Sequence, residues 1–163
     1  MPSKGFSIVS SKNLGDIKYG KDIINYSITT SPGSSLYVFA FYPDTTNLQN
    51  FIYNNLYVTD LDSGKVRDNF NRYLNQYDVL NEINSFTTNV ITHKVEYYQF
   101  WFYTTYTTIV YAGDQNFRDF LFSAPNVKEY DGNFHEPVLI FTGDAIGVFA
   151  SAVRDTVTFR IVP

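Results

Sequence analysis

The stretch that decides the fold is Val95-Glu96-Tyr97-Tyr98-Gln99-Phe100-Trp101-Phe102-Tyr103, followed by a second run, Thr107-Thr108-Ile109-Val110-Tyr111. Both runs are rich in aromatic and β-branched residues and almost free of charge, and the second ends at Gly113-Asp114. Residues of these types pack well on a pleated surface, and glycine followed by aspartate is typical of a turn. The sequence therefore predicts neighbouring β-strands over Val95–Tyr103 and Thr107–Ala112.

Working outward, short apolar runs recur along the whole chain, with turn dipeptides such as Pro32-Gly33 and Asp131-Gly132 between several of them. The other candidate strands are Phe6–Ser10, Asp22–Thr30, Leu36–Tyr42, Phe51–Val58, Phe86–Thr92, Phe117–Phe122, Val138–Thr142, Gly147–Ala152 and Thr156–Val162. Many short strands with regular turns predict an all-β fold, specifically a two-sheet antiparallel sandwich of jelly-roll type. A barrel is the alternative.

The closing strand has the clearest alternation in the chain. Val157, Phe159 and Ile161 are apolar, and the residues between them are polar. Because successive side chains of a strand point to opposite faces, these three residues are expected to face the core.

One segment breaks the strand pattern. Between residues 66 and 80 the apolar residues fall at helical spacing, and Asp68 is placed to cap the start of a helix. The interleaved asparagines are poor helix formers. The pattern predicts a short helix or an irregular excursion near 66–80.

The composition describes one domain with an unusual surface. The 163 residues are 44% hydrophobic and 18% aromatic, but only 17% are charged. We therefore expect a single domain over residues 1–163, with a surface supplied mainly by Asn, Asp, Ser, Thr and Tyr. The net charge of −4 argues against nucleic acid as a partner, because nucleic acid rewards clustered Lys and Arg.

Two further features bear on where the protein acts. The chain has no cysteine, which removes disulfides and thiolate chemistry, and no apolar stretch is long enough to span a membrane. The N-terminus, Met1-Pro2-Ser3-Lys4-Gly5, lacks the apolar core of a signal peptide. The expectation is a cytoplasmic protein, or one exported without a recognisable signal.

The aromatic strand supplies the leading candidate binding surface. One of its faces would be an ordinary core face, made by Tyr98, Phe100 and Phe102. The other combines rings with an amide, in Tyr97, Gln99, Trp101 and Tyr103. Flat rings beside hydrogen-bonding groups suit a sugar, whose C–H bonds pack on a ring while its hydroxyls take directional bonds. The alternative, that this face packs against the second sheet or another subunit, is the more common arrangement for aromatic residues.

Polar residues at predicted turns could complete a sugar site, because loops at one end of a sandwich can converge. The candidates are Asp114, Asn116 and Asp144. Asp and Asn are also common in turns for purely local reasons. The run 60–64 resembles half of a calcium loop but lacks its later ligands, and a hairpin turn explains it more simply. His93 and His135 are isolated, so we predict no metal, no cofactor and no catalytic residue.

A resemblance to a known family covers residues 95–162. Its motifs are Phe100-Trp101-Phe102, Ile109-Val110-Tyr111-Ala112-Gly113, Phe120-Leu121-Phe122 and Val157-Thr158-Phe159. This succession resembles the domain named after farnesoic acid O-methyltransferase in arthropods. The resemblance implies a lectin-like β-sandwich. It does not imply methyl transfer, because the chain has no βα unit that could hold a methyl donor.

Three functions follow, in order of support. The first is a non-catalytic, lectin-like recognition module that binds a carbohydrate or glycoconjugate; because single sugar sites are weak, a homo-oligomer is expected. The second is a self-assembling structural protein, such as a coat, matrix or storage subunit. The third is a glycosidase that uses two of the chain's four glutamates, which nothing in their spacing indicates.

Overall fold

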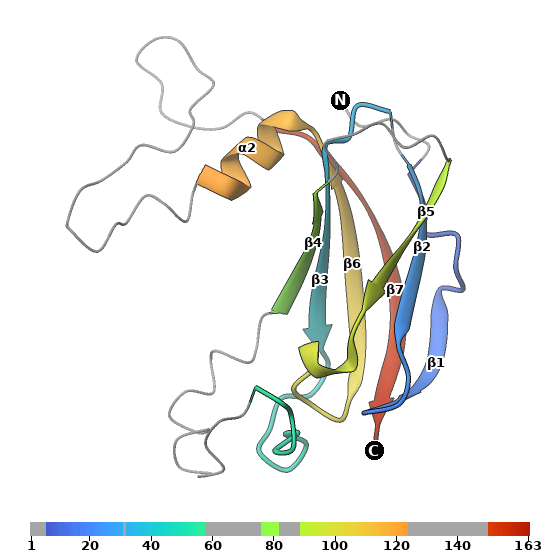
Figure 1. Cartoon of the computed structure of the whole chain (residues 1–163), viewed down its shortest axis with the longest axis vertical. Helices are drawn as coiled ribbons and strands as arrows, with labels where there is room; N and C mark the ends of the chain where they lie inside the picture. Colours follow the sequence, from blue (N-terminus) through green and yellow to red (C-terminus); the bar gives the residue numbers. More distant parts are fainter. Residues whose placement is uncertain (1–5, 31, 58–75, 82–88, 124–149) are drawn as a thin grey trace, which may run out of the picture.

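The computed structural model describes residues 6–30, 32–57, 76–81, 89–123 and 150–163. This part of the chain is built mostly from strands, which form two sheets, together with one α-helix, α2 (Gln115–Ser123), and a short 3₁₀ helix, η2 (Tyr97–Gln99). Figure 1 shows the strands running roughly along the long axis, with α2 at one end. The predicted all-β class is confirmed.

The larger sheet has five strands. Across the sheet they are β1 (Asn13–Lys18), β7 (Ala152–Val162), β6 (Thr105–Gly113), β3 (Leu36–Pro43) and β4 (Gln76–Asn81). The pairs β7–β6, β6–β3 and β3–β4 are antiparallel. The edge pair β1–β7 is parallel, so the predicted fully antiparallel arrangement is wrong at this edge.

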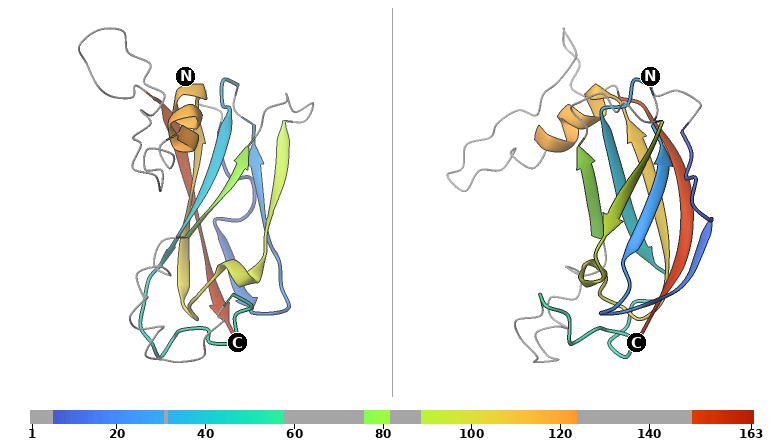
Figure 2. Two further views of the ribbon diagram at one scale, coloured as in Figure 1. Left: turned by 60° about the vertical axis from the view of Figure 1, so that its left-hand side comes forward. Right: turned by 45° about the vertical axis from the view of Figure 1, so that its right-hand side comes forward.

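The smaller sheet pairs β2 (Ile24–Thr29) with β5 (Val90–Val95) in antiparallel register. The segment before β1 lies along the other side of β2: the Val9 amide donates to the Ser27 carbonyl, and Ile8 forms a bridge with Ile28. Figure 2 shows β2 and β5 crossing in front of the larger sheet.

Side chains from both sheets share one hydrophobic core. Tyr26 of β2 is fully buried and lies against Phe39 and Phe41 of β3, with ring centroids 5.3 and 6.4 Å away. Its hydroxyl forms a hydrogen bond of 2.9 Å with the buried Thr108 hydroxyl of β6. Because this polar pair is satisfied, burial of both hydroxyls is tolerated in an otherwise apolar interior.

The closing strand behaves as predicted. Val157, Phe159 and Ile161 are each 1% exposed and belong to the core, whereas the residues between them are partly or fully exposed. The strand is longer than predicted and begins at Ala152. Of the predicted strand Gly147–Ala152, residues 147–149 lie outside the described part, residues 150–151 are not in a strand, and Ala152 begins β7.

Two other predictions are corrected. Residues 117–122, predicted as a strand, lie in helix α2, which the Asp114 carboxylate caps by accepting a hydrogen bond of 2.9 Å from the Phe117 amide. The end of the predicted 66–80 helix is strand β4, and residues 66–75 lie outside the described part. The apolar residues of both segments fit either periodicity, and contacts beyond the segment decide between them.

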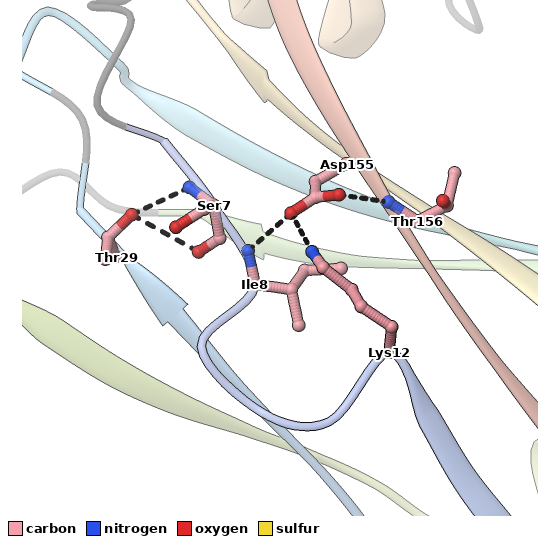
Figure 3. A network of polar contacts seen from close by, with 6 residues as sticks. All are labelled: Ser7, Ile8, Lys12, Thr29, Asp155 and Thr156. Atoms are coloured by element: carbon pink, nitrogen blue, oxygen red, sulfur yellow. Dashed lines mark hydrogen bonds and ion pairs between the residues drawn. The ribbon is translucent and has the colours of Figure 1, made fainter.

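Asp155 of β7 ties the N-terminal segment to the larger sheet (Figure 3). Its carboxylate accepts hydrogen bonds from the Ile8 amide and the Thr156 amide, both at 2.8 Å, and pairs with the Lys12 ammonium. Partial burial raises the pKa of Asp155, but these three donors outweigh it, so the pKa lies below the usual value for an aspartate. The same balance lowers the pKa of Asp114, through the Ser151 hydroxyl and the Phe117 and Ser151 amides.

We expect Asp155→Asn to lower the free energy of unfolding by about 1–2 kcal/mol near neutral pH, because the neutral amide accepts weaker hydrogen bonds and loses the ion pair. A depressed pKa stabilises the fold above the unfolded-state pKa, near 4, and that stability is lost as the pH falls through the folded-state pKa. Urea unfolding between pH 6 and pH 3 should therefore show a shallower acid loss in Asp155→Asn. Asp44→Asn, which changes an exposed carboxylate, is the control; an unchanged pH profile in Asp155→Asn would contradict the assignment.

Candidate functional site

The aromatic segment after β5 is not a strand. Val95 ends β5, residues 97–99 form the 3₁₀ turn η2, and residues 101–103 then pair with the loop formed by residues 50–57. The predicted strand Val95–Tyr103 is therefore wrong beyond its first residue. The predicted division of residues 97–103 into two alternating faces depended on that strand, so it is wrong as well.

The loop at residues 50–57 holds this segment in place. The Ile52 amide donates to the Trp101 carbonyl at 2.9 Å, and the Tyr103 amide donates to the Asn50 carbonyl at 2.7 Å. The side chain of Asn55, only 3% exposed, donates to the carbonyls of Tyr98 and Phe100 at 2.8 and 3.1 Å. Backbone groups that would pair in a strand therefore bond to this loop.

Trp101 belongs to the core. Its side chain is 8% exposed and its ring stacks on Phe51, with centroids 6.1 Å apart and planes 15° apart. The flanking Phe100 and Phe102 are completely buried, as predicted. Trp101, predicted as the centre of an exposed platform, has no ring face broadly open to solvent.

The exposed aromatic surface lies beside it, in five tyrosines that we call the tyrosine cluster: Tyr19, Tyr57, Tyr97, Tyr98 and Tyr103. Tyr19 contacts Tyr97 and Tyr103, Tyr97 contacts Tyr98, and Tyr98 contacts Tyr57. Ring centroids in these pairs are 4.9 to 5.9 Å apart and the rings meet edge to face.

The cluster is open to solvent at one end. Tyr57 is 62% exposed and the adjacent Leu56 is 71% exposed. The other four tyrosines are half-buried, so their edges are fixed by packing while part of each ring stays accessible. Rings held in this way lose little side-chain entropy when a ligand stacks on them.

Two hydroxyls of the cluster, those of Tyr19 and Tyr103, have raised pKa values. Burial raises the pKa of Tyr19, and the neighbouring Tyr103 and Tyr97 raise it further; burial also raises the pKa of Tyr103. The Tyr19 hydroxyl and the side-chain carbonyl oxygen of Gln99 are both buried without a hydrogen bond to any described residue. One donor and one acceptor therefore remain unused at this end of the fold.

The loop residues predicted to complete the site lie elsewhere. Asp114 and Asn116 lie at the start of α2, at the end of the sheets opposite to η2 (Figure 2). Strand β6 separates them from Tyr103 by nine extended residues, roughly 30 Å at about 3.3 Å per residue. Both oxygens of the Asp114 carboxylate are used, one by the Phe117 amide and the other by the Ser151 amide and hydroxyl. Asp144 lies outside the described residues.

Only some of the residues considered for catalysis or metal binding lie in the described part of the chain. Among residues that the structure describes, no group of three or more His, Asp or Glu side chains could hold a metal ion. His93 points into the core and stacks on Phe39 with centroids 4.4 Å apart. Glu96 pairs with Lys94 at 2.8 Å, and the other glutamates, like His135 and the loop at 60–64, lie outside the described part.

Comparison with known proteins returned no relative: no family model, curated protein or solved structure matches this chain. Within the described residues, no helix is long and apolar enough to cross a membrane.

Sequence reasoning grouped Tyr97, Gln99 and Tyr103, which lie at this end of the fold, but it did not include Tyr19, Tyr57 or the contact made by Tyr98. These come from three separate loops, and no spacing in the sequence places them together. The only signal was the abundance of tyrosine, with 14 in the chain.

Proposed function

We propose that this protein is a non-catalytic recognition module that binds carbohydrate through the tyrosine cluster. The observation that carries the proposal is the chain of edge-to-face contacts from Tyr103 to Tyr57, which holds several partly open rings in fixed positions. Sugar C–H groups stack on such rings, while the phenol hydroxyls that reach solvent bond to sugar hydroxyls. Asp114 and Asn116 are not part of this site, and Trp101 supports it from the core.

The finer architecture belongs to the same proposal. We infer that the two sheets are the layers of a β-sandwich of jelly-roll type, whose edge pair β1–β7 is parallel. Residues 95–162 resemble the lectin-like domain family named after farnesoic acid O-methyltransferase, which is consistent with sugar binding. A homo-oligomer would multiply weak single sites into useful avidity.

The test is a glycan array probed with the labelled protein and with Tyr57→Ser and Tyr98→Ser. We expect selective binding by the parent and a loss of about tenfold in affinity for each variant, which is the equivalent of about 1.4 kcal/mol. Tyr42→Ser is the matched control, because Tyr42 is also an exposed tyrosine, at 44%, but lies outside the cluster. A blank array, or equal binding by the parent and both cluster variants, would reject the proposal.

A second candidate function is a self-assembling structural protein. It is favoured by the adjacent Leu56 and Tyr57, which present apolar surface to solvent of the kind that protein interfaces bury. Sedimentation of the purified protein separates the two. If the protein forms a large closed or polymeric assembly and Leu56→Ser dissociates it, assembly through this surface is supported. If the protein is a small oligomer and Leu56→Ser leaves its size unchanged, assembly through this surface is rejected.

A further inference from the structure

One extra residue in β1 forms a bulge at the edge of the larger sheet. Asn13 lies opposite Thr158 and Asp16 lies opposite Arg160, so β1 advances three residues while β7 advances two. Gly15 has a φ of +76°, in the left-handed region that favours glycine, and its amide donates to the Asn13 side-chain oxygen at 2.8 Å. Bulges of this kind redirect side chains and are frequent beside binding sites. Figure 2 shows β1 running along β7 at this edge.

A cleft of about 240 Å³ lies at the bulge. Its polar lining comes from three strands: Asn13 and Asp16 of β1, Thr105 of β6, and Thr158 and Arg160 of β7. Pockets for drug-sized ligands measure roughly 300–1,000 Å³, so this cleft suits a smaller ligand, of about the size of one sugar ring.

The charges of the cleft select the kind of ligand. Arg160 offers up to five N–H donors and Asp16 offers only acceptors, and both side chains are exposed. Although they lie opposite each other in register, neither forms an ion pair with any described residue. An anion would be attracted by Arg160 and repelled by Asp16. A cation would be attracted by Asp16 and repelled by Arg160. A neutral ligand whose groups both donate and accept can satisfy the two together.

We propose that this cleft is a second carbohydrate subsite, which takes one neutral pyranose and binds two adjacent ring hydroxyls between Asp16 and Arg160. One hydroxyl donates to the Asp16 carboxylate, the neighbouring hydroxyl accepts from the Arg160 guanidinium, and the Thr105 hydroxyl completes the polar contacts. Hydrogen bonds to charged groups are stronger than neutral ones, so a small contact area suffices for selective, weak binding. The inference rests on the proposed function for its ligand class, but it concerns a site separate from the tyrosine cluster.

The experiment is a titration of the full chain, labelled with ¹⁵N, with the methyl pyranosides of glucose, galactose and mannose. We expect the backbone amide signals of Gly15, Asp16 and Arg160 to shift saturably with at least one of them, with a dissociation constant on the order of 1 mM. Tetrahydropyran-2-methanol, which has the ring but no adjacent hydroxyls, should leave these signals unchanged.

Variants then test the two charges. Arg160→Gln and Asp16→Asn should each weaken pyranoside binding at least about fivefold. Arg154→Gln is the matched control, because Arg154 is another exposed arginine of β7 that does not line the cleft. If no pyranoside shifts these signals, or if Arg160→Gln and Asp16→Asn both bind as the parent does, the cleft is not a sugar subsite.

The two proposals fail separately. Tyr57→Ser should leave the pyranoside titration of the cleft unchanged while it reduces binding on the array. Saturable shifts at Gly15 together with a blank array would sustain the cleft and reject the tyrosine cluster. Array binding that depends on Tyr57, together with an unresponsive Gly15 signal, would reject the cleft alone.

Discussion

Replacing Trp101 with alanine should lower the free energy of unfolding by about 3–5 kcal/mol, because it removes a large ring from a close-packed core and leaves a cavity. The ring is 8% exposed, stacks on Phe51, and lies between two fully buried phenylalanines. For a chain of this length that loss corresponds to a fall in melting temperature on the order of 10 °C. It is a large share of the total stability of a typical domain, which is roughly 5–15 kcal/mol.

Chemical denaturation measures this effect, and fluorescence checks its cause. Trp101 is the only tryptophan in the chain, so its emission should be blue-shifted and poorly quenched by iodide in the folded parent. Tyr57→Ala removes a comparable ring that is 62% exposed and should change stability by less than about 0.5 kcal/mol. If Trp101→Ala were as stable as the parent, and iodide strongly quenched the parent's fluorescence, Trp101 would be an exposed residue of the binding surface and not part of the core.

The closing strand shows where sequence patterns are sufficient. Val157, Phe159 and Ile161 alternate with polar residues on a strand with one apolar face, so shifting the register by one residue would expose all three. The cost of exposing these three side chains depends only on residues of the strand itself, so the sequence of the strand is enough to predict its buried face. In β6 the core-facing residues Tyr106, Thr108 and Val110 include a threonine, so the sequence of that strand does not show which face is buried.

The aromatic segment shows where sequence patterns fail. Residues 97–103 have a strong preference for strands, but β-propensity describes how a side chain fits a half-buried pleated surface, and a folded loop can supply similar burial. Here the loop at residues 50–57 supplies both the apolar contact, through Phe51, and the hydrogen-bond partners, through Asn55. Those contacts join residues more than forty positions apart, so no local window contains them.

The candidate site also contains residues that the sequence could group and residues that it could not. Tyr97, Gln99 and Tyr103 were predicted together because they would share one face of a strand. That strand is absent, but the three residues are close in the sequence and still lie near one end of the fold. Tyr19 joins them only because the backbone after β1 pairs with the end of β7, where the Tyr19 amide donates to the Val162 carbonyl at 2.8 Å. The topology of the larger sheet therefore assembles the tyrosine cluster, and the sequence alone could not reveal it.

Asn55 should be the most sensitive polar position of the described structure. Its amide nitrogen donates to two backbone carbonyls, and its oxygen accepts from the Tyr57 amide at 3.0 Å. Asn55→Ala removes all three bonds at a site that is 3% exposed, leaving buried carbonyls without partners. We expect a loss of about 2–4 kcal/mol in the free energy of unfolding, since each buried unsatisfied group costs about 1–3 kcal/mol and such costs are not fully additive.

Asn55→Asp distinguishes hydrogen bonding from packing, because it keeps the shape of the side chain. A carboxylate cannot donate to the carbonyls of Tyr98 and Phe100, and it places a buried negative charge against them, so this variant should be at least as unstable as Asn55→Ala. The neighbouring Asn54 is exposed, and Asn54→Asp should leave stability within about 0.5 kcal/mol of the parent. Hydrogen exchange should quicken first at the Phe100 and Tyr103 amides in Asn55→Asp, and glycan binding should fall with it, because Asn55 bonds to the backbone that carries Tyr57 and Tyr98. A fully stable Asn55→Asp protein would mean that this side chain does not hold the cluster together.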